Sequence, residues 1–434
     1  MTQPKYPRRF WSALVLFSLI GQVAWVVENM YLNVFIYKMF DASASAISTM
    51  VAASSVAATV TTVLIGALSD KLGKRKLFIC GGYIVWGISI ACFALIRVDI
   101  LGIWFPSVTA AAAAGVSLVI ALDCLMTFFG SAANDACFNA WLTDSTDETG
   151  RGAAEGINSM MPLVAILVVF GGFMAFDLDK AESWTWIFLI IGGVVLIAGL
   201  LGLWLIRETP VKNPENQRYF QNIFYGFRPS VIRGNAMLYV TLLAFAVFGI
   251  SIQIFMPYLI LYYEVSLGMA DYVLVMAPAI LLASVATALY GRVYDRVGYR
   301  GAVVPALLML AAGYVVLFLF KNTLLVFVGS LLMMCGYLCG SAVFGAMIRD
   351  CTPKGKAGMF QGLRIFGQVL IPGMIGPMIG AAVLANAETV VNNDGTTSFI
   401  PNENIFLAAL VAEIALAVVL AITFAAFKKE KSHE

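Results

Sequence analysis

The sequence predicts an all-α membrane protein with twelve transmembrane helices in two six-helix bundles. Apolar residues make up 61% of the chain and charged residues only 12%, whereas soluble domains contain roughly 45–50% and 25%. The apolar runs continue for ~20 residues or more, which is the length that a helix needs to cross a bilayer. They lack the period of two that barrel strands require. Helices are therefore the remaining way to satisfy the backbone in lipid.

The longest internal polar segment divides the apolar runs into two equal sets. This segment holds Pro210, Pro214 and Pro229, and we interpret it as a linker between two domains. The predicted domains are residues 1–206 and 236–434, and the linker is 207–235. The predicted spans are residues 10–37, 45–68, 77–96, 108–141, 153–176, 184–206, 236–263, 268–291, 301–320, 323–348, 357–385 and 405–427.

The basic residues predict the orientation of the chain in the membrane. Of the 27 Lys and Arg residues, Lys38, Arg97, Lys180 and Lys321 fall in loops on one side, Arg364 lies within a span, and all others lie on the opposite side. Cytoplasmic loops carry the excess of positive charge. Both termini are therefore predicted to be cytoplasmic, in a multi-pass protein of the cytoplasmic (plasma or cell inner) membrane.

Composition excludes several classes of function. The net charge of +2 gives no indication of a nucleic-acid partner. The single histidine, His433, lies in the C-terminal tail, which removes any His-dependent catalytic triad or His-ligated zinc site. No nucleophile–base pair or metal-ligand cluster is visible in the sequence. We therefore expect a non-enzymatic monomer without cofactor or metal, with the bilayer and a small molecule as its partners.

The two halves share the loop pattern Gly-x3-Asp-basic-x-Gly-x-Arg. It joins the second and third spans of the first half and recurs between the eighth and ninth spans. Glycine permits tight turns, and the aspartate can pair with arginine or a helix N-terminus. Such a repeat on either side of a linker is typical of two-bundle transporters. The pattern consists of Gly66, Asp70, Gly73 and Arg75, and of Gly291, Asp295, Gly298 and Arg300.

A second repeat lies between the fourth and fifth spans of each half. Asp144 begins an Asp-x-Thr sequence that precedes Gly156 by the same spacing as Asp350 precedes Gly362. With both repeats in place, the chain resembles the major facilitator superfamily over its whole length. The resemblance implies the two-bundle fold of that superfamily. It also implies that Asp70 and the basic residues of the loops form a cytoplasmic gate.

Within that superfamily the chain resembles the glycoside–pentoside–hexuronide:cation symporters and the sucrose/proton symporters. Asp135 falls where melibiose-type permeases carry a fourth-helix aspartate that bridges the sugar and cation sites. The resemblance therefore implies cation-coupled sugar transport, with a proton as the coupling ion and sodium as the alternative. The stretches that carry the resemblance are residues 21–33, 134–144 and 151–156, with the partner pair 361–362.

The chain also departs from those symporters. Ala58 and Thr62 replace the two second-helix carboxylates of the sodium-coupled members, and Gln22 replaces the sugar-binding aspartate of the first helix. The expected eleventh-helix lysine is absent from 370–373, and Asn139 stands near the place of the fourth-helix arginine of the sucrose symporters. These departures argue against a sodium site of the family type.

The first span carries polar residues where lipid is expected. At about 100° per residue, Gln22, Trp25, Asn29 and Asn33 fall within about 80° of one another. An aromatic ring beside amides suits a sugar, whose C–H face packs on the ring. The alternative is a packing seam between helices. We predict that these four residues bind substrate.

Three carboxylates also lie within spans, where each costs ~2.5–3.5 kcal/mol. Glu28 flanks the stripe of the first span, whereas Asp123 and Asp135 lie in the fourth. Burial disfavours the charged form of a carboxyl group. We therefore predict that Glu28 and Asp135 couple transport to protons, against the alternative that both are static hydrogen-bond partners.

The remaining predicted substrate ligands are polar residues of both halves. In the second half, Arg364 and Glu413 are also polar residues within spans, and either could be structural. The remaining predicted ligands are Asp123, Asn134 and Asn139 in the first half, and Gln253, Tyr337 and Gln368 in the second.

The first functional hypothesis is a proton-coupled symporter of a sugar or glycoside that works by alternating access. The second is an efflux or exchange carrier for another small organic molecule, since fold does not dictate substrate. A third, of another class, is a membrane sensor or scaffold that transports nothing. The sequence shows no appended soluble domain to relay a signal, which disfavours the third.

Overall fold

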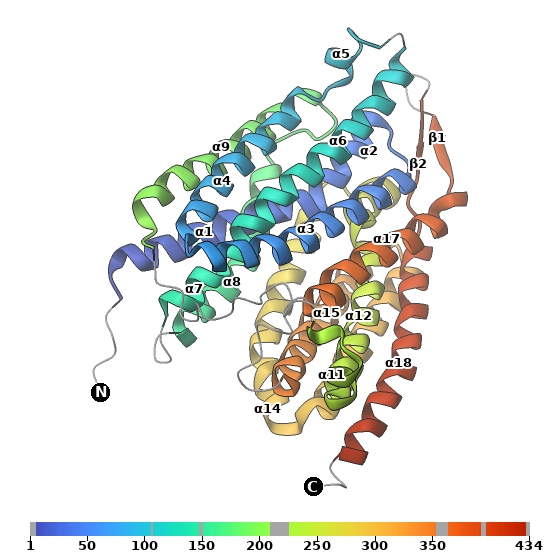
Figure 1. Ribbon diagram of the computed structural model, residues 1–434. Helices are drawn as coiled ribbons and strands as arrows, with labels where there is room; N and C mark the ends of the chain where they lie inside the picture. Colours follow the sequence, from blue (N-terminus) through green and yellow to red (C-terminus); the bar gives the residue numbers. More distant parts are fainter. Residues whose placement is uncertain are drawn as a thin grey trace. The chain divides into compact units, whose positions relative to one another are not determined.

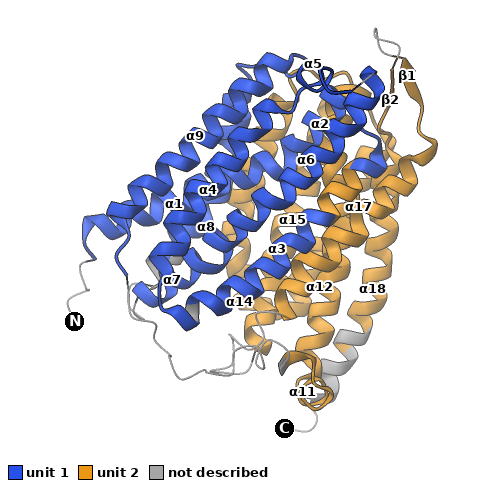
Figure 2. Cartoon of the chain, turned by 45° about the horizontal axis from the view of Figure 1, so that its top comes forward, with its two compact units in different colours: residues 1–46, 53–219 blue, residues 47–52, 220–434 orange. Residues whose placement is uncertain are grey.

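The computed structural model describes residues 6–105, 107–146, 151–208, 225–352, 363–391 and 396–430. Within this part of the chain, eleven helices are long and apolar enough to cross a membrane. The chain divides into unit 1, residues 1–46 and 53–219, and unit 2, residues 47–52 and 220–434, which Figure 2 shows in blue and orange. The predicted linker lies mostly outside the described residues.

All regular secondary structure in the described residues of unit 1 is helical. Two of its long helices contain a π-helical segment, at Val27–Tyr31 between α1 and α2 and at Ser131–Phe138 between α6 and α7. The helices, shown in Figure 1, are α1 Arg8–Val26, α2 Leu32–Phe40, α3 Ala44–Leu72, α4 Arg75–Cys92, α5 Val98–Leu101, α6 Val108–Gly130, α7 Asn139–Ser145, α8 Arg151–Phe173 and α9 Ala181–Leu205.

Unit 2 combines long helices with a small hairpin. Its strands β1 (Thr389–Val391) and β2 (Thr397–Phe399) pair antiparallel. Further π-helical segments lie at Tyr262–Ser266 and Phe366–Leu370. The α-helices are α11 Pro229–Gly234, α12 Ala236–Phe255, α13 Leu259–Leu261, α14 Tyr272–Leu319, α15 Thr323–Cys351, α17 Ile371–Val383 and α18 Asn404–Glu430.

Local sequence signals set several helix ends. Ser43 and Ser107 cap α3 and α6, because each serine oxygen accepts a hydrogen bond from the backbone N–H three residues later. Gly73 ends α3 in the left-handed conformation, with φ of 64°, which glycine adopts without a steric penalty. These caps satisfy backbone groups that a helix alone leaves unpaired.

The helix α14, Tyr272–Leu319, covers most of both the eighth and the ninth predicted spans. It is interrupted at Gly298, where φ is 68° and ψ is −178°, a conformation that a residue with a side chain rarely adopts. The two predicted spans, 268–291 and 301–320, lie on either side of this residue. This continuity explains why eleven candidate helices correspond to twelve predicted spans.

In unit 1, glycines bring α4 and α9 into backbone contact. A Cβ atom placed on Gly192 would lie 2.6 Å from the carbonyl oxygen of Gly87 and 2.7 Å from the backbone nitrogen of Ala91. Neither backbone atom can turn aside as a flexible side chain could. The two helices lie side by side in Figure 1, and small residues of this kind allow close helix packing in membranes.

The glycine contact makes a prediction about stability. Gly192→Ala should destabilise the protein by about 1–3 kcal/mol, as overpacking of a core does, because the new methyl group meets backbone on α4. Gly193→Ala is the matched control, since a Cβ there meets no atom within 4 Å and alanine favours the helix by roughly 0.5–1 kcal/mol. Thermal unfolding in detergent measures both. Equal midpoints for the two variants would contradict this account of the packing.

Candidate functional site

Glu28 lies on the π-helical segment that joins α1 to α2, and it is only 7% exposed. The Thr127 hydroxyl of α6 donates a hydrogen bond of 2.8 Å to Oε1 of Glu28. Within the described residues, Oε2 of Glu28 has no hydrogen-bond partner. Short π-helical segments are frequent at functional sites. One oxygen of this buried carboxylate is thus held, and the other remains available.

Asp123 is the closest electrostatic partner of Glu28. It lies on α6 one turn before Thr127 and is 1% exposed. Ser54 of α3 is its hydrogen-bond partner, whereas its Oδ1 atom has none among the described residues. The charge of Asp123 acts on Glu28 more strongly than that of any other residue, and no described Lys or Arg acts on either group. Like charges in an apolar interior disfavour joint ionisation, so the pair is suited to hold a proton.

Asp135 completes a group of three carboxylates in unit 1. It lies in the π-helical segment Ser131–Phe138, is half-buried, and acts on Glu28 more weakly than Asp123 does. The predicted coupling residues Glu28 and Asp135 therefore belong to one electrostatic environment. The sequence suggested Asp123 as a substrate ligand. In the structure its charge is also the one that acts most strongly on Glu28.

Trp25 packs against Trp86, a residue that sequence reasoning missed. Their ring centroids are 5.0 Å apart at an interplanar angle of 47°. Gly130 makes room for both rings, since a Cβ there would lie 2.7 Å from Trp86 and 3.0 Å from Trp25. Among the described residues, neither indole N–H has an acceptor. The sequence feature that could have identified Trp86 is its position within a span. Tryptophan in membrane proteins is usually enriched at the membrane interfaces.

The structure corrects the predicted stripe on the first span. Asn33 is fully buried, whereas Asn29 is exposed and Gln22 and Trp25 are partly buried. The stripe assumed uniform α-helical rotation, but the π-helical segment Val27–Tyr31 adds a residue to one turn and rotates the rest of the helix. The amides of Asn29 and Asn33 donate to backbone carbonyls of their own helix, at 2.8 and 2.9 Å.

Asn134 serves helix packing in this structure. Its amide donates to the Tyr83 hydroxyl at 2.6 Å and to the Phe17 carbonyl at 3.4 Å, and Tyr83 donates to the same carbonyl at 2.8 Å. Gly21 leaves the space for this cluster, which links α1, α4 and the Ser131–Phe138 segment. Asn139 is exposed and donates to the Asp135 carbonyl. Both residues remain predicted ligands, but protein groups already occupy their amides.

The predicted ligands of the second half lie in unit 2. Gln253 on α12, Tyr337 on α15 and Gln368 on the Phe366–Leu370 segment are all partly buried. The Nε atom of Arg364 is buried and has no hydrogen-bond partner among the described residues. Arg349 is the charged group that acts on Arg364, so no described carboxylate neutralises it.

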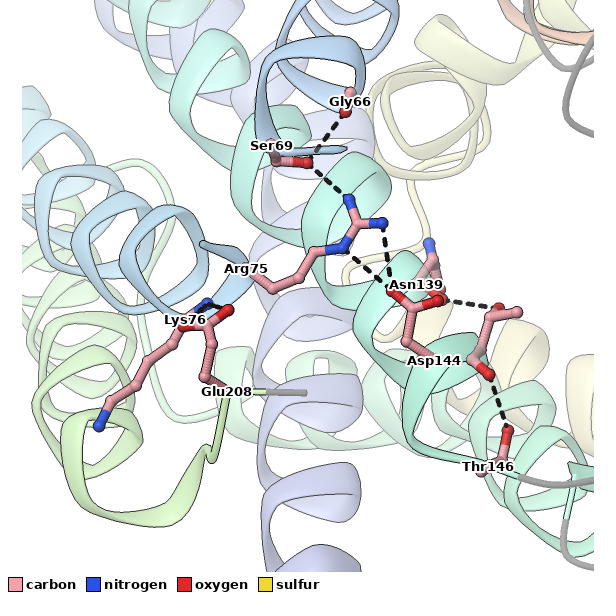
Figure 3. Close-up of polar contacts among 9 residues, drawn as sticks. Gly66, Ser69, Arg75, Lys76, Asn139, Asp144, Thr146 and Glu208 are labelled. Carbon is pink, nitrogen blue, oxygen red and sulfur yellow. Dashed lines mark hydrogen bonds and ion pairs between the residues drawn. The ribbon is translucent and has the colours of Figure 1, made fainter. Parts of the chain in front are cut away.

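The first copy of the repeated loop contains a buried ion pair. Arg75 donates to Oδ2 of Asp144 through Nε at 3.3 Å and through Nη2 at 3.2 Å, and to the Ser69 hydroxyl at 2.6 Å (Figure 3). The two side chains of the ion pair are 5% and 11% exposed. Ser69 in turn donates to the Gly66 carbonyl. The ion pair fixes the loop after α3 to the end of α7. The side chain of Asp70 lies outside the described residues.

The second copy also has a glycine at positive φ, but its ψ of −178° differs from the 21° of Gly73, and its side chains make different contacts. Gly298 matches Gly73 in its positive φ. Arg300, the counterpart of Arg75, instead donates to the Phe424 carbonyl and lies over that ring, 5.0 Å from its centroid. Asp350, the counterpart of Asp144, accepts a hydrogen bond of 2.5 Å from Tyr294.

A cavity of about 630 Å³ opens beside the second loop, between the ends of α12 and α15 and the middle of α14. Asp295, Gly298 and Asp350 contribute to its lining. In the matching place of unit 1, Arg75 occupies the space beside Asp144. Two of the four predicted gate positions of this half, Asp295 and Gly298, therefore line a cavity, whereas Arg75 of unit 1 forms an ion pair.

The fold is similar to that of solved transporters. A bacterial homologue of the human lysosomal transporter Spinster, in an inward-facing and occupied conformation, is 17% identical over 98% of both chains, with a TM-score of 0.69. The nucleoside transporter NupG is 14% identical over 96% of this chain and 98% of its own, with a TM-score of 0.66. A D-xylose–proton symporter is 16% identical over 94% and 97%, with a TM-score of 0.68.

No curated protein matches the chain in sequence. Residues 10–377 match the sequence family described as the Major Facilitator Superfamily, which is most of the chain and includes both copies of the repeated loop. The proteins of similar fold are transporters as well. The chain therefore belongs to the Major Facilitator Superfamily, and it is a multi-pass membrane transporter rather than an enzyme.

Proposed function

We propose that the protein is a proton-coupled symporter that carries a sugar or glycoside across the cytoplasmic membrane by alternating access. The observation that carries the proposal is the pairing of Glu28 with Asp123. Both carboxyl groups are buried, each keeps one oxygen without a hydrogen bond, and no described cation acts on either. Such a pair can take up a proton on one side of the membrane and release it when water enters from the other.

The aromatic pair supports a sugar as the substrate. Trp25 is partly exposed beside Glu28, and the indole N–H groups of Trp25 and Trp86 are unpartnered within the described residues. A buried donor without an acceptor is costly, and a sugar hydroxyl can supply that acceptor while its C–H face packs on the ring. A D-xylose–proton symporter has a similar fold, which agrees with this proposal.

Residues of this chain also support the coupling ion and the orientation in the membrane that we propose. Ala58 and Thr62 supply no carboxylate on α3, which favours a proton over sodium because sodium sites need several oxygen ligands of suitable geometry. The bias of Lys and Arg supports the proposal that both termini are cytoplasmic. A monomer suffices for this mechanism, because one chain supplies both helix bundles.

An exchange or efflux carrier for another small organic molecule is the second candidate. The observation that favours it is the same Trp25–Trp86 pair, since a flat aromatic ligand such as a nucleobase would also stack there. The nucleoside transporter NupG has a similar fold. An exchanger would not need a proton gradient, so transport driven by that gradient separates the two candidates.

The first prediction concerns Glu28→Gln. This substitution keeps the size of the side chain and the contact with Thr127 but removes the proton-binding group, so accumulation against a gradient should be lost. Exchange of substrate down its own gradient should remain, because exchange needs no net proton movement. Uptake and counterflow in proteoliposomes measure both. Glu182→Gln is the control, since that side chain is 72% exposed. Undiminished accumulation by the Glu28 variant would remove Glu28 from the mechanism.

The second prediction concerns Trp25→Ala. Loss of the ring and its N–H donor should weaken substrate binding at least about tenfold, which corresponds to ~1.4 kcal/mol. Trp204→Ala is the matched control, because Trp204 is 76% exposed on α9 of the same unit. The concentration dependence of uptake measures both variants. If the affinity of the Trp25 variant equals that of the wild type, this aromatic pair is packing and the proposed sugar site is misplaced.

A further inference from the structure

Glu413 lies on the buried face of α18, although it is an acidic residue within a span. Its side chain is directed into unit 2, because the residue is 6% exposed. At about 100° per residue, the neighbours on its own face are buried and those on the opposite face are exposed. The buried neighbours are Phe406, Ala409, Leu416 and Leu420, and the exposed residues are Val411, Ile414 and Val418. Glu413 therefore cannot reach water along the helix surface.

No described protein group satisfies this carboxyl group. Neither Oε1 nor Oε2 of Glu413 has a hydrogen-bond partner among the described residues. The polar groups one turn away are committed elsewhere, since Ser251 of α12 donates to the Ala409 carbonyl at 2.9 Å and lies 3.1 Å from the Tyr314 hydroxyl. A buried polar group without a partner is rare in native structures and requires an explanation.

No described counter-charge stands near Glu413 on any helix that packs against α18. The helices α12 and α17 contain no charged residue. On α14, Tyr314 is the titratable group that the charge of Glu413 affects. Arg300 of α14 is bound to the Phe424 carbonyl, about 16 Å further along α18 at 1.5 Å per residue. An ionised Glu413 would be an isolated buried charge, which proteins avoid by neutralising the group.

From this geometry we propose that Glu413 is a proton-binding site of unit 2, separate from the carboxylates of unit 1. The ligand is a single proton, held on a carboxyl group between α12, α14 and α18. A leucine or methionine would fill the same space without leaving a polar group unpaired, so packing alone does not explain a glutamate here. The site depends neither on Glu28 nor on the identity of the substrate.

Infrared spectroscopy of the protein in lipid vesicles tests the proposal directly. A protonated carboxyl group has a C=O stretching band that a carboxylate lacks, and labelling glutamate alone with ¹³C shifts the glutamate bands away from those of Asp123 and Asp135. At neutral pH we expect a protonated-glutamate band of Glu413 in the wild type and the loss of that component in Glu413→Gln. The band of Glu413 should lie at higher frequency than that of Glu28, because only Glu28 has a hydrogen bond.

Three further variants make the assignment specific. Glu413→Met replaces the side chain with an apolar one of similar length. It can be measured even if the amide of Glu413→Gln cannot be accommodated in the apolar interior. This variant should lose the same band. Glu28→Gln and the exposed Glu388→Gln should keep it. The proposal is overturned if both Glu413 variants retain the full band, or if the wild type shows no protonated glutamate at neutral pH. It is also overturned if Glu28→Gln alone removes the whole signal.

Discussion

The constraint on which the rest of this structure depends is the apolar environment of membrane-spanning helices, which offers polar groups few hydrogen-bond partners. Backbone groups meet it by forming helices, because a helix satisfies its own hydrogen bonds. Carboxyl groups can meet it only with a donor, a cation or a proton. Arg75 and Asp144 solve the problem with a buried ion pair. Glu28, Asp123 and Glu413 have at most one hydrogen bond for each group and no described cation. Proton binding would neutralise them, and the functions that we propose for both units rest on it.

The two copies of the repeated loop show that one sequence pattern can support different interactions. Both loops place a glycine at positive φ, at Gly73 and Gly298, although ψ is 21° at the first and −178° at the second. The side-chain contacts differ, because an arginine pairs with the aspartate in unit 1 and with a backbone carbonyl and an aromatic ring in unit 2. Phe424 on α18 offers Arg300 a partner outside the repeat. The positive φ is available to both loops because each has a glycine there, whereas the side-chain partner depends on which helix packs alongside.

The helical class, the long apolar spans and the family could be predicted from the sequence, because composition and the loop pattern are local properties. The arrangement of the site was less accessible. The π-helical segment at Val27–Tyr31 has no sequence signature, and it separated Asn29 from Asn33 in exposure. Trp86 and Thr127 join the site through tertiary packing, which periodicity within a single helix does not contain. Asn134 looked available in sequence, but Tyr83 occupies its amide. The polar residues were thus found, whereas their partners needed the fold.

The most direct test of the central claim is uptake of a panel of labelled sugars into proteoliposomes that contain the purified protein. The vesicles would carry an imposed pH gradient, a sodium gradient or neither. The pairing of Glu28 with Asp123 predicts that at least one sugar accumulates under the pH gradient alone and does not accumulate without it. If no sugar accumulates under any gradient, proton-coupled sugar symport is contradicted, and exchange of another small molecule becomes the better description of this transporter.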